Sequence, residues 1–202
     1  MFLASAAYAL VALVLWLAFL AFGLPLPDVA GGPVVWHAHE MMFGFVLAAV
    51  TGFTLTAVPE FTSTAPFSSV VGLRFAALWL AGRLLYWLSG VLGPWPVAVA
   101  DLALPLALAA TVGPRLVRDP DRRHTGFLWA ILAFAAAAAG FHVDVLRGAY
   151  PMRFIDAAVG ATMALILVAL GRVSMRIVND AIDAMHRDDA EVPEYLARRP
   201  RR

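Results

Sequence analysis

Residues 36–58 read WHAHEMMFGFVLAAVTGFTLTAV, which places two imidazoles, a carboxylate and two thioethers at the start of a long apolar segment. A helix that crosses a bilayer needs about 20 predominantly apolar residues, and this segment, which Pro59 follows, is long enough. Because hydrocarbon makes ionisable side chains costly, those that occur at membrane depth commonly serve a function. Residues 36–44 therefore predict a metal- or haem-binding corner at the end of a membrane helix.

The composition of the whole chain agrees with a membrane protein. The 202 residues are 62% hydrophobic and only 14% charged, with a mean hydropathy of +0.80, whereas a soluble domain carries about a quarter charged residues. The chain has no cysteine, which excludes thiolate zinc sites, iron–sulfur clusters and disulfides. A metal would have to be held by His, Met, Asp or Glu. We find no phosphate-binding loop and no signature of nucleic-acid binding.

Six apolar segments are long enough, or nearly so, to span a membrane. They cover residues 2–24, 36–58, 70–92, 95–112, 125–146 and 154–178. The sequence therefore predicts an all-α, polytopic helix bundle with six transmembrane helices in residues 1–178. Residues 179–202 are polar, and we expect them to form a cytoplasmic tail.

The arginines predict the orientation of this bundle, because short cytoplasmic loops collect basic residues. The loops after the first and third helices carry none, whereas the loop after the fourth carries Arg115, Arg118, Arg122 and Arg123. The tail carries five more, and only two lie after the fifth helix. Both termini are therefore predicted to be cytoplasmic, which places the histidine-rich corner at the opposite, periplasmic face.

With this orientation, several ionisable residues, which are costly to place in hydrocarbon, lie at the same depth in the membrane. His142 ends the fifth helix at the same face as His37 and His39, and Asp101 lies about two turns into the fourth helix. Imidazole suits haem iron, copper and zinc. We therefore predict His37, His39 and His142 as metal or cofactor ligands. If they do not bind a metal, they cap and pack a helix interface.

Met41 and Met42 are further candidate ligands, because a methionine thioether favours Cu(I) or an axial position on haem. Methionine is also an ordinary filler of irregular apolar space, so both interpretations stay open. At about 100° per residue, His37, Glu40 and Gly44 share one helical face and His39 points nearly opposite. Two histidines placed in this way cannot readily bind one ion from a regular helix.

Arg83 is the most deeply placed charge in the predicted bundle, and it keeps its proton there. It needs an anionic partner, for which Asp101, Glu40 or a haem propionate would serve. Glu40 and Asp101 are predicted to orient a ligand through a hydrogen bond, and Glu40 is a possible proton carrier. Gly44 and Gly52 lie on one face at a spacing that permits close approach of another helix.

Several motifs resemble those of the NnrS family, which are bacterial haem- and copper-containing inner-membrane proteins associated with the response to nitric oxide. They are WHAHEMMFGFV at 36–46, GFTLTAVP at 52–59, LWLAGR at 78–83, FH at 141–142 and GRV at 171–173. The resemblance covers the first half of a usual family member. Residues 174–177 read SMRI, where the family has a proline and a Phe-Thr pair.

The resemblance implies a multi-pass protein of the bacterial inner membrane with a function in the nitric oxide or nitrosative-stress response. It implies haem and copper as cofactors, and it matches family motif positions at His37, His39, Glu40, Arg83 and His142. A half-length member is expected to pair with a second copy or with a second membrane subunit, or to have kept the fold and lost an activity. Whether the chain is an enzyme stays open.

Two other functions are compatible with the sequence. One is a non-catalytic assembly or structural subunit that partners another membrane protein. The other is a proton or ion transporter that uses Glu40, Arg83 and Asp101 as a relay.

Overall fold

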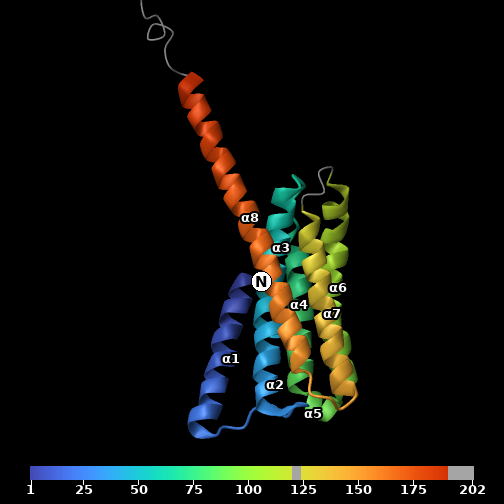
Figure 1. The fold of residues 1–202 in the computed structure, drawn as a ribbon. Helices are drawn as coiled ribbons and strands as arrows, with labels where there is room; N and C mark the ends of the chain where they lie inside the picture. Colours follow the sequence, from blue (N-terminus) through green and yellow to red (C-terminus); the bar gives the residue numbers. More distant parts are fainter. Residues whose placement is uncertain (120–123, 191–202) are drawn as a thin grey trace, which may run out of the picture. The chain divides into compact units, whose positions relative to one another are not determined.

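The computed structural model describes residues 1–119 and 124–190, and all regular secondary structure in these ranges is helical (Figure 1). Six of the helical segments are long and apolar enough to cross a membrane. These segments are Phe2–Phe22, Gly32–Phe61, Ser69–Trp87, Pro94–Arg118, Thr125–Leu146 and Met152–Met185. The predicted all-α bundle with six potential spans is confirmed, whereas the cytoplasmic placement of both termini stays a prediction.

The chain order of the elements is simple. They are α1 (Phe2–Phe22), α2 (Gly32–His39), the π-helix η1 (Glu40–Val46), α3 (Leu47–Phe61), α4 (Ser69–Trp87), α5 (Ser89–Leu92), α6 (Pro94–Arg118), α7 (Thr125–Leu146) and α8 (Met152–Ala190). The elements α2, η1 and α3 follow one another without a break and make up the second span.

Glycine and proline fix the first connection. The residue after α1, Gly23, has φ +66° and donates its N–H to the Phe19 carbonyl at 2.9 Å, which is the usual left-handed end of a helix. Pro33 stands in the first turn of α2, where its missing N–H costs no helical hydrogen bond. Pro59, in contrast, does not end the second span as predicted, since α3 continues to Phe61.

The π-helix η1 interrupts the second span within the stretch that the sequence singled out. A π-helical segment lacks the regular i→i+4 bonds and is frequent at functional sites. Side chains of neighbouring helices bond two of its carbonyl groups. Trp79 Nε1 of α4 donates to the Gly44 carbonyl at 2.8 Å, and Ser5 Oγ of α1 donates to the Phe45 carbonyl at 3.1 Å.

Small residues let α1 approach the second span closely, as the sequence predicts. A Cβ added at Gly44 would lie 2.7 Å from Cε1 of Tyr8, and one added at Gly52 would lie 3.0 Å from Cβ of Met1. Elsewhere α6 packs against α7 and α4. The largest fully buried apolar side chains are Trp36, Phe43, Phe127, Phe141, Leu47, Leu108, Leu116 and Ile131.

The chain divides into two compact units, Met1–Leu165 and Ile166–Arg202. Within the second unit the described residues, 166–190, continue α8 as one helix. The sixth helix therefore extends past the predicted end at Val178. The predicted division into a membrane domain and a cytoplasmic tail at residue 178 stays a prediction, and residues 191–202 of that tail lie outside the described residues.

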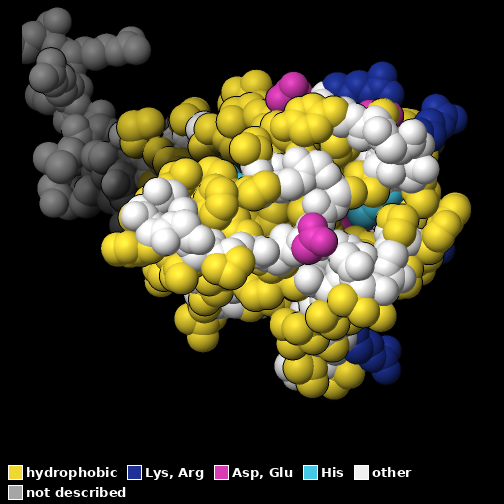
Figure 2. Space-filling model, turned by 90° about the horizontal axis from the view of Figure 1, so that it is seen from below, with side chains coloured by type: hydrophobic (Ala, Val, Ile, Leu, Met, Phe, Trp, Pro, Cys, Tyr) yellow, Lys and Arg dark blue, Asp and Glu magenta, His cyan; other side chains and the backbone are white. Residues whose placement is uncertain are grey.

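The first unit has a distinct end made by residues 23–31, α5 and residues 147–151, which lie together (Figure 1). We call it the Asp28 end. Figure 2 looks onto this end and shows mostly apolar and uncharged atoms, with a few acidic and basic side chains among them. Along α1, large apolar side chains such as Leu3 and Leu10 are exposed. An apolar helix with an exposed apolar surface is typical of a helix that faces lipid.

Candidate metal centre

Three buried side chains from three helices converge near the Asp28 end. They are His39 of α2, Asp101 of α6 and His142 of α7, and one ligand atom of each lies within 4.8 Å of the others. Nε2 of His39 lies 2.8 Å from Asp101 Oδ2, and Nε2 of His142 lies 3.0 Å from the same oxygen. We call these three residues the His–Asp cluster.

The order of the helices explains why these residues meet. The helices α2 and α6 start at the Asp28 end and α7 finishes there. At 1.5 Å per residue, His39 and Asp101 lie about 10 Å from the starts of their helices, and His142 lies about 6 Å from the end of its own. His39, Asp101 and His142 thus lie at a similar distance from the Asp28 end, as the sequence predicts, and the packing of their helices brings them into contact.

Arg83 bridges two buried carboxylates beside the cluster. Its Nη1 donates to Glu40 Oε2 at 3.1 Å, and its Nη2 donates to Asp101 Oδ1. The same Glu40 oxygen accepts from the Tyr8 hydroxyl, and Trp87 Nε1 donates to that hydroxyl at 3.1 Å. Both predicted partners of Arg83 are therefore confirmed. With the two carboxylates ionised and the histidines neutral, the buried group carries one uncompensated negative charge.

His37 and His39 point to different neighbours. The ring of His37 is half-buried and stacks on Trp16 of α1, with ring centroids 4.4 Å apart. Glu40 also contacts α1, through Tyr8, whereas the completely buried His39 turns toward α6 and α7. The predicted opposition of the two histidines is confirmed. His37 is not a member of the His–Asp cluster, and its predicted ligand role stays a prediction.

Met41 and Met42 both lie in η1 and are half-buried. Their predicted roles as metal ligands also stay predictions.

Sequence reasoning missed two tyrosines at the site. The ring of Tyr86 stacks on His39 with centroids 3.5 Å apart and an angle of 17° between the planes. Tyr8 holds Glu40 from α1. The sequence features that could have indicated them are weak. Tyr86 follows Arg83 by three residues, which places both on one helical face. Tyr8 is one of two hydroxyl residues in an apolar segment.

Several buried polar atoms around the cluster have no hydrogen-bond partner among the described residues. They are His39 Nδ1, Glu40 Oε1 and Arg83 Nε. The first two lie 3.8 Å apart, which is too long for a hydrogen bond. Because buried polar groups are usually satisfied, this unused capacity points to a site that binds a further group.

The donor set fits a single metal ion. Two imidazole nitrogens with one carboxylate oxygen suit copper, iron or zinc. A haem fits less well at this position, because both Nε2 atoms face one carboxylate oxygen and Tyr86 covers a face of the His39 ring. No slot for a porphyrin separates these described side chains.

Comparison with family models identifies the family of the chain. No curated protein and no solved structure matches the chain. A family model described as NnrS protein matches residues 1–199, a range that includes every residue of the His–Asp cluster and its Arg83 bridge. The chain therefore belongs to the NnrS family.

Proposed function

We propose that this chain is a multi-pass membrane metalloprotein of the bacterial nitric oxide response, and that the His–Asp cluster binds one copper ion near the periplasmic face. The observation that carries the proposal is the convergence of both Nε2 atoms on Asp101 Oδ2, with all three residues at most 4% exposed. Membership of the NnrS family supports the nitric oxide response, and the distribution of arginines supports the orientation.

The net charge of the buried residues around the cluster favours a monovalent cation. The uncompensated negative charge of Glu40, Asp101 and Arg83 attracts a cation in a region of low dielectric constant. A monovalent ion would leave the buried group neutral, whereas a divalent ion would leave it positive, and buried net charge is costly. Among the metals that imidazole suits, copper is the one with a stable monovalent state, Cu(I).

The surrounding residues have separable tasks. Arg83 holds the Asp101 carboxylate through Oδ1, which leaves Oδ2 directed at the two histidines. Tyr86 packs on the His39 ring and fixes its plane. Bound copper would supply one-electron chemistry and a coordination position for a small ligand. A haem site elsewhere in the chain, with His37 as a ligand, remains a prediction.

The first test is the copper stoichiometry of detergent-purified protein loaded with Cu(I). We expect one copper per chain in the parent. His142→Gln and Asp101→Asn should each lower the affinity at least tenfold, because each removes one of three ligands. His37→Gln is the control, since it alters a histidine of α2 that lies outside the cluster, and it should bind copper as the parent does. Equal copper binding by all four proteins would refute this site.

The second test concerns the biological role. A bacterium that lacks its own NnrS protein would be given the parent chain or His142→Gln, and its growth would be followed after exposure to a nitric oxide donor. We expect the parent to restore growth and the variant to fail at equal membrane abundance. Equal growth with both proteins would separate the cluster from the nitric oxide response.

A proton pathway is a second candidate function. Tyr8, Glu40, Arg83 and Asp101 form a continuous chain of hydrogen bonds from α1 to both histidines of the cluster. In vesicles, Glu40→Gln should then abolish the proton flux that the parent protein supports. The absence of flux in the parent protein would remove this candidate.

A further inference from the structure

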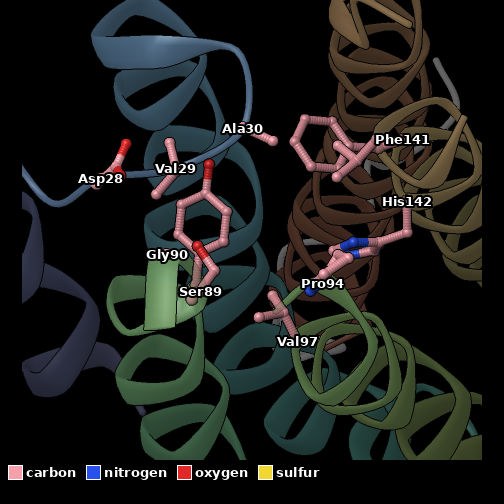
Figure 3. A pocket seen from close by; sticks show the side chains of 11 residues that line it. Asp28, Val29, Ala30, Ser89, Gly90, Pro94, Val97, Phe141 and His142 are labelled. Carbon is pink, nitrogen blue, oxygen red and sulfur yellow. The ribbon is translucent and has the colours of Figure 1, made fainter. Parts of the chain in front are cut away.

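A cavity of about 350 Å³ lies at the Asp28 end, beside the His–Asp cluster. Figure 3 shows Phe141 and His142 of α7 on one side and the segment with Asp28 on the other, with Ser89 of α5 below it. The wall near α5 is tight, since a Cβ added at Gly90 would lie 2.8 Å from the Asp28 carbonyl oxygen. Ligand sites in proteins begin at about this size.

Two hydroxyl groups of the cavity wall have no hydrogen-bond partner among the described residues. They belong to Tyr86, which is 4% exposed, and to Ser89, and both oxygens are buried. Buried hydroxyl groups normally find a partner in the protein or in a bound group. Since both residues line the cavity, a molecule inside it is the available partner.

The remaining wall restricts the chemistry of that molecule. No arginine is among the described residues that line the cavity, the chain has no lysine, and Asp28 contributes a carboxylate. In the metal-free protein, an anion would therefore meet the like charge of Asp28, and no arginine lies among the described residues of the wall to compensate it. The apolar part of the wall, which includes Val97 and Phe141, suits a small uncharged molecule.

The cavity adjoins the cluster through two shared residues. His142 lines the cavity and also contacts Asp101. Tyr86 lines the cavity and stacks on His39. A molecule in the cavity thus lies against the outer edge of the proposed copper site.

We propose that the cavity binds a small, uncharged molecule that accepts hydrogen bonds from Tyr86 and Ser89, and that it is the site from which such a ligand reaches the cluster. The last part rests on the proposed function, because it requires a metal at the cluster. The binding site itself does not require the metal, and it is tested on metal-free protein.

The absence of cysteine from the chain allows a clean test. Val145→Cys places the only thiol of the protein in the cavity wall, and Val143→Cys on the same helix places one outside it, at a side chain that is 40% exposed. Both variants would be treated with the uncharged reagent methyl methanethiosulfonate, and modification would be followed by intact mass spectrometry. Dimethyl sulfoxide, a small uncharged acceptor, would be compared with acetate as a protecting molecule.

We expect dimethyl sulfoxide to slow the modification of Val145→Cys, and acetate to leave it unchanged. Neither should protect Val143→Cys. Adding Tyr86→Phe and Ser89→Ala to the Val145→Cys background should raise the protecting concentration of dimethyl sulfoxide by about 25-fold or more, because each lost hydrogen bond contributes about fivefold to tenfold and the two factors multiply.

The outcomes separate this inference from the proposed function. No protection by dimethyl sulfoxide, equal protection by acetate, or unchanged protection after loss of both hydroxyl groups would overturn the ligand site, whatever the copper content. Protection that depends on the hydroxyl groups, in a protein that binds no copper, would support the ligand site while the copper proposal fails.

Discussion

Replacement of Arg83 is the most informative test of how this bundle tolerates buried charge. In the parent, Arg83 lies between two completely or almost completely buried carboxylates, Glu40 and Asp101. Arg83→Met keeps much of the side-chain length but raises the uncompensated negative charge of the group from one to two. A pair of charges 3.1 Å apart, as for Arg83 and Glu40, interacts by about 5 kcal/mol at an effective dielectric constant of about 20.

The expected loss of stability follows from these contacts. Removing one partner of a buried ion pair costs about 3–5 kcal/mol, because the other charge stays buried. For a chain of about this length, that corresponds to a fall of roughly 6–20 °C in the midpoint of thermal unfolding. The midpoint would be measured in detergent by circular dichroism. Arg74→Met is the matched control, since Arg74 lies in the same helix but is exposed, and it should change the midpoint little.

A second substitution tests whether the loss of stability comes from the uncompensated charge. Glu40→Gln in the Arg83→Met background returns the uncompensated charge to one, so the double variant should be more stable than Arg83→Met alone. If Arg83→Met unfolds at the same temperature as Arg74→Met, or if the double variant is no more stable than the single one, charge compensation does not explain this arrangement.

Further predictions concern packing and metal binding. Gly44→Ala should lower stability by about 1–3 kcal/mol, because the new methyl group would lie 2.7 Å from Tyr8, and thermal unfolding of the variant measures this. Gly140→Ala should have a similar cost, since its Cβ would overlap the Phe154 ring at 2.1 Å. Gly160→Ala should instead stabilise the protein by about 0.5–1 kcal/mol, because Gly160 lies inside α8 and its added Cβ meets open space. Copper affinity should fall from neutral to about pH 5, because imidazole and carboxylate ligands bind metal only when deprotonated, and competition with a Cu(I) chelator at several pH values would show it. An affinity that does not change with pH would exclude histidine ligation.

The sequence by itself determined the membrane spans and the family, because both depend on local features. Apolar length predicts a span without knowledge of its neighbours. The depth of each polar residue also follows from its distance to a helix end, so that His39, Asp101 and His142 were assigned to one depth. The two faces of the second helix, with His37 and His39 opposed, followed from helical periodicity.

Only the tertiary structure decided which of these residues meet. Residues at one depth can lie on any side of a bundle, and lateral position depends on how helices pack and rotate against one another. Packing of α6 and α7 turns Asp101 and His142 toward His39 and leaves His37 against Trp16 of α1. The same packing stacks Tyr86 on His39 and forms the cavity beside them. These contacts join segments far apart in the chain, and no local pattern of the sequence specifies them.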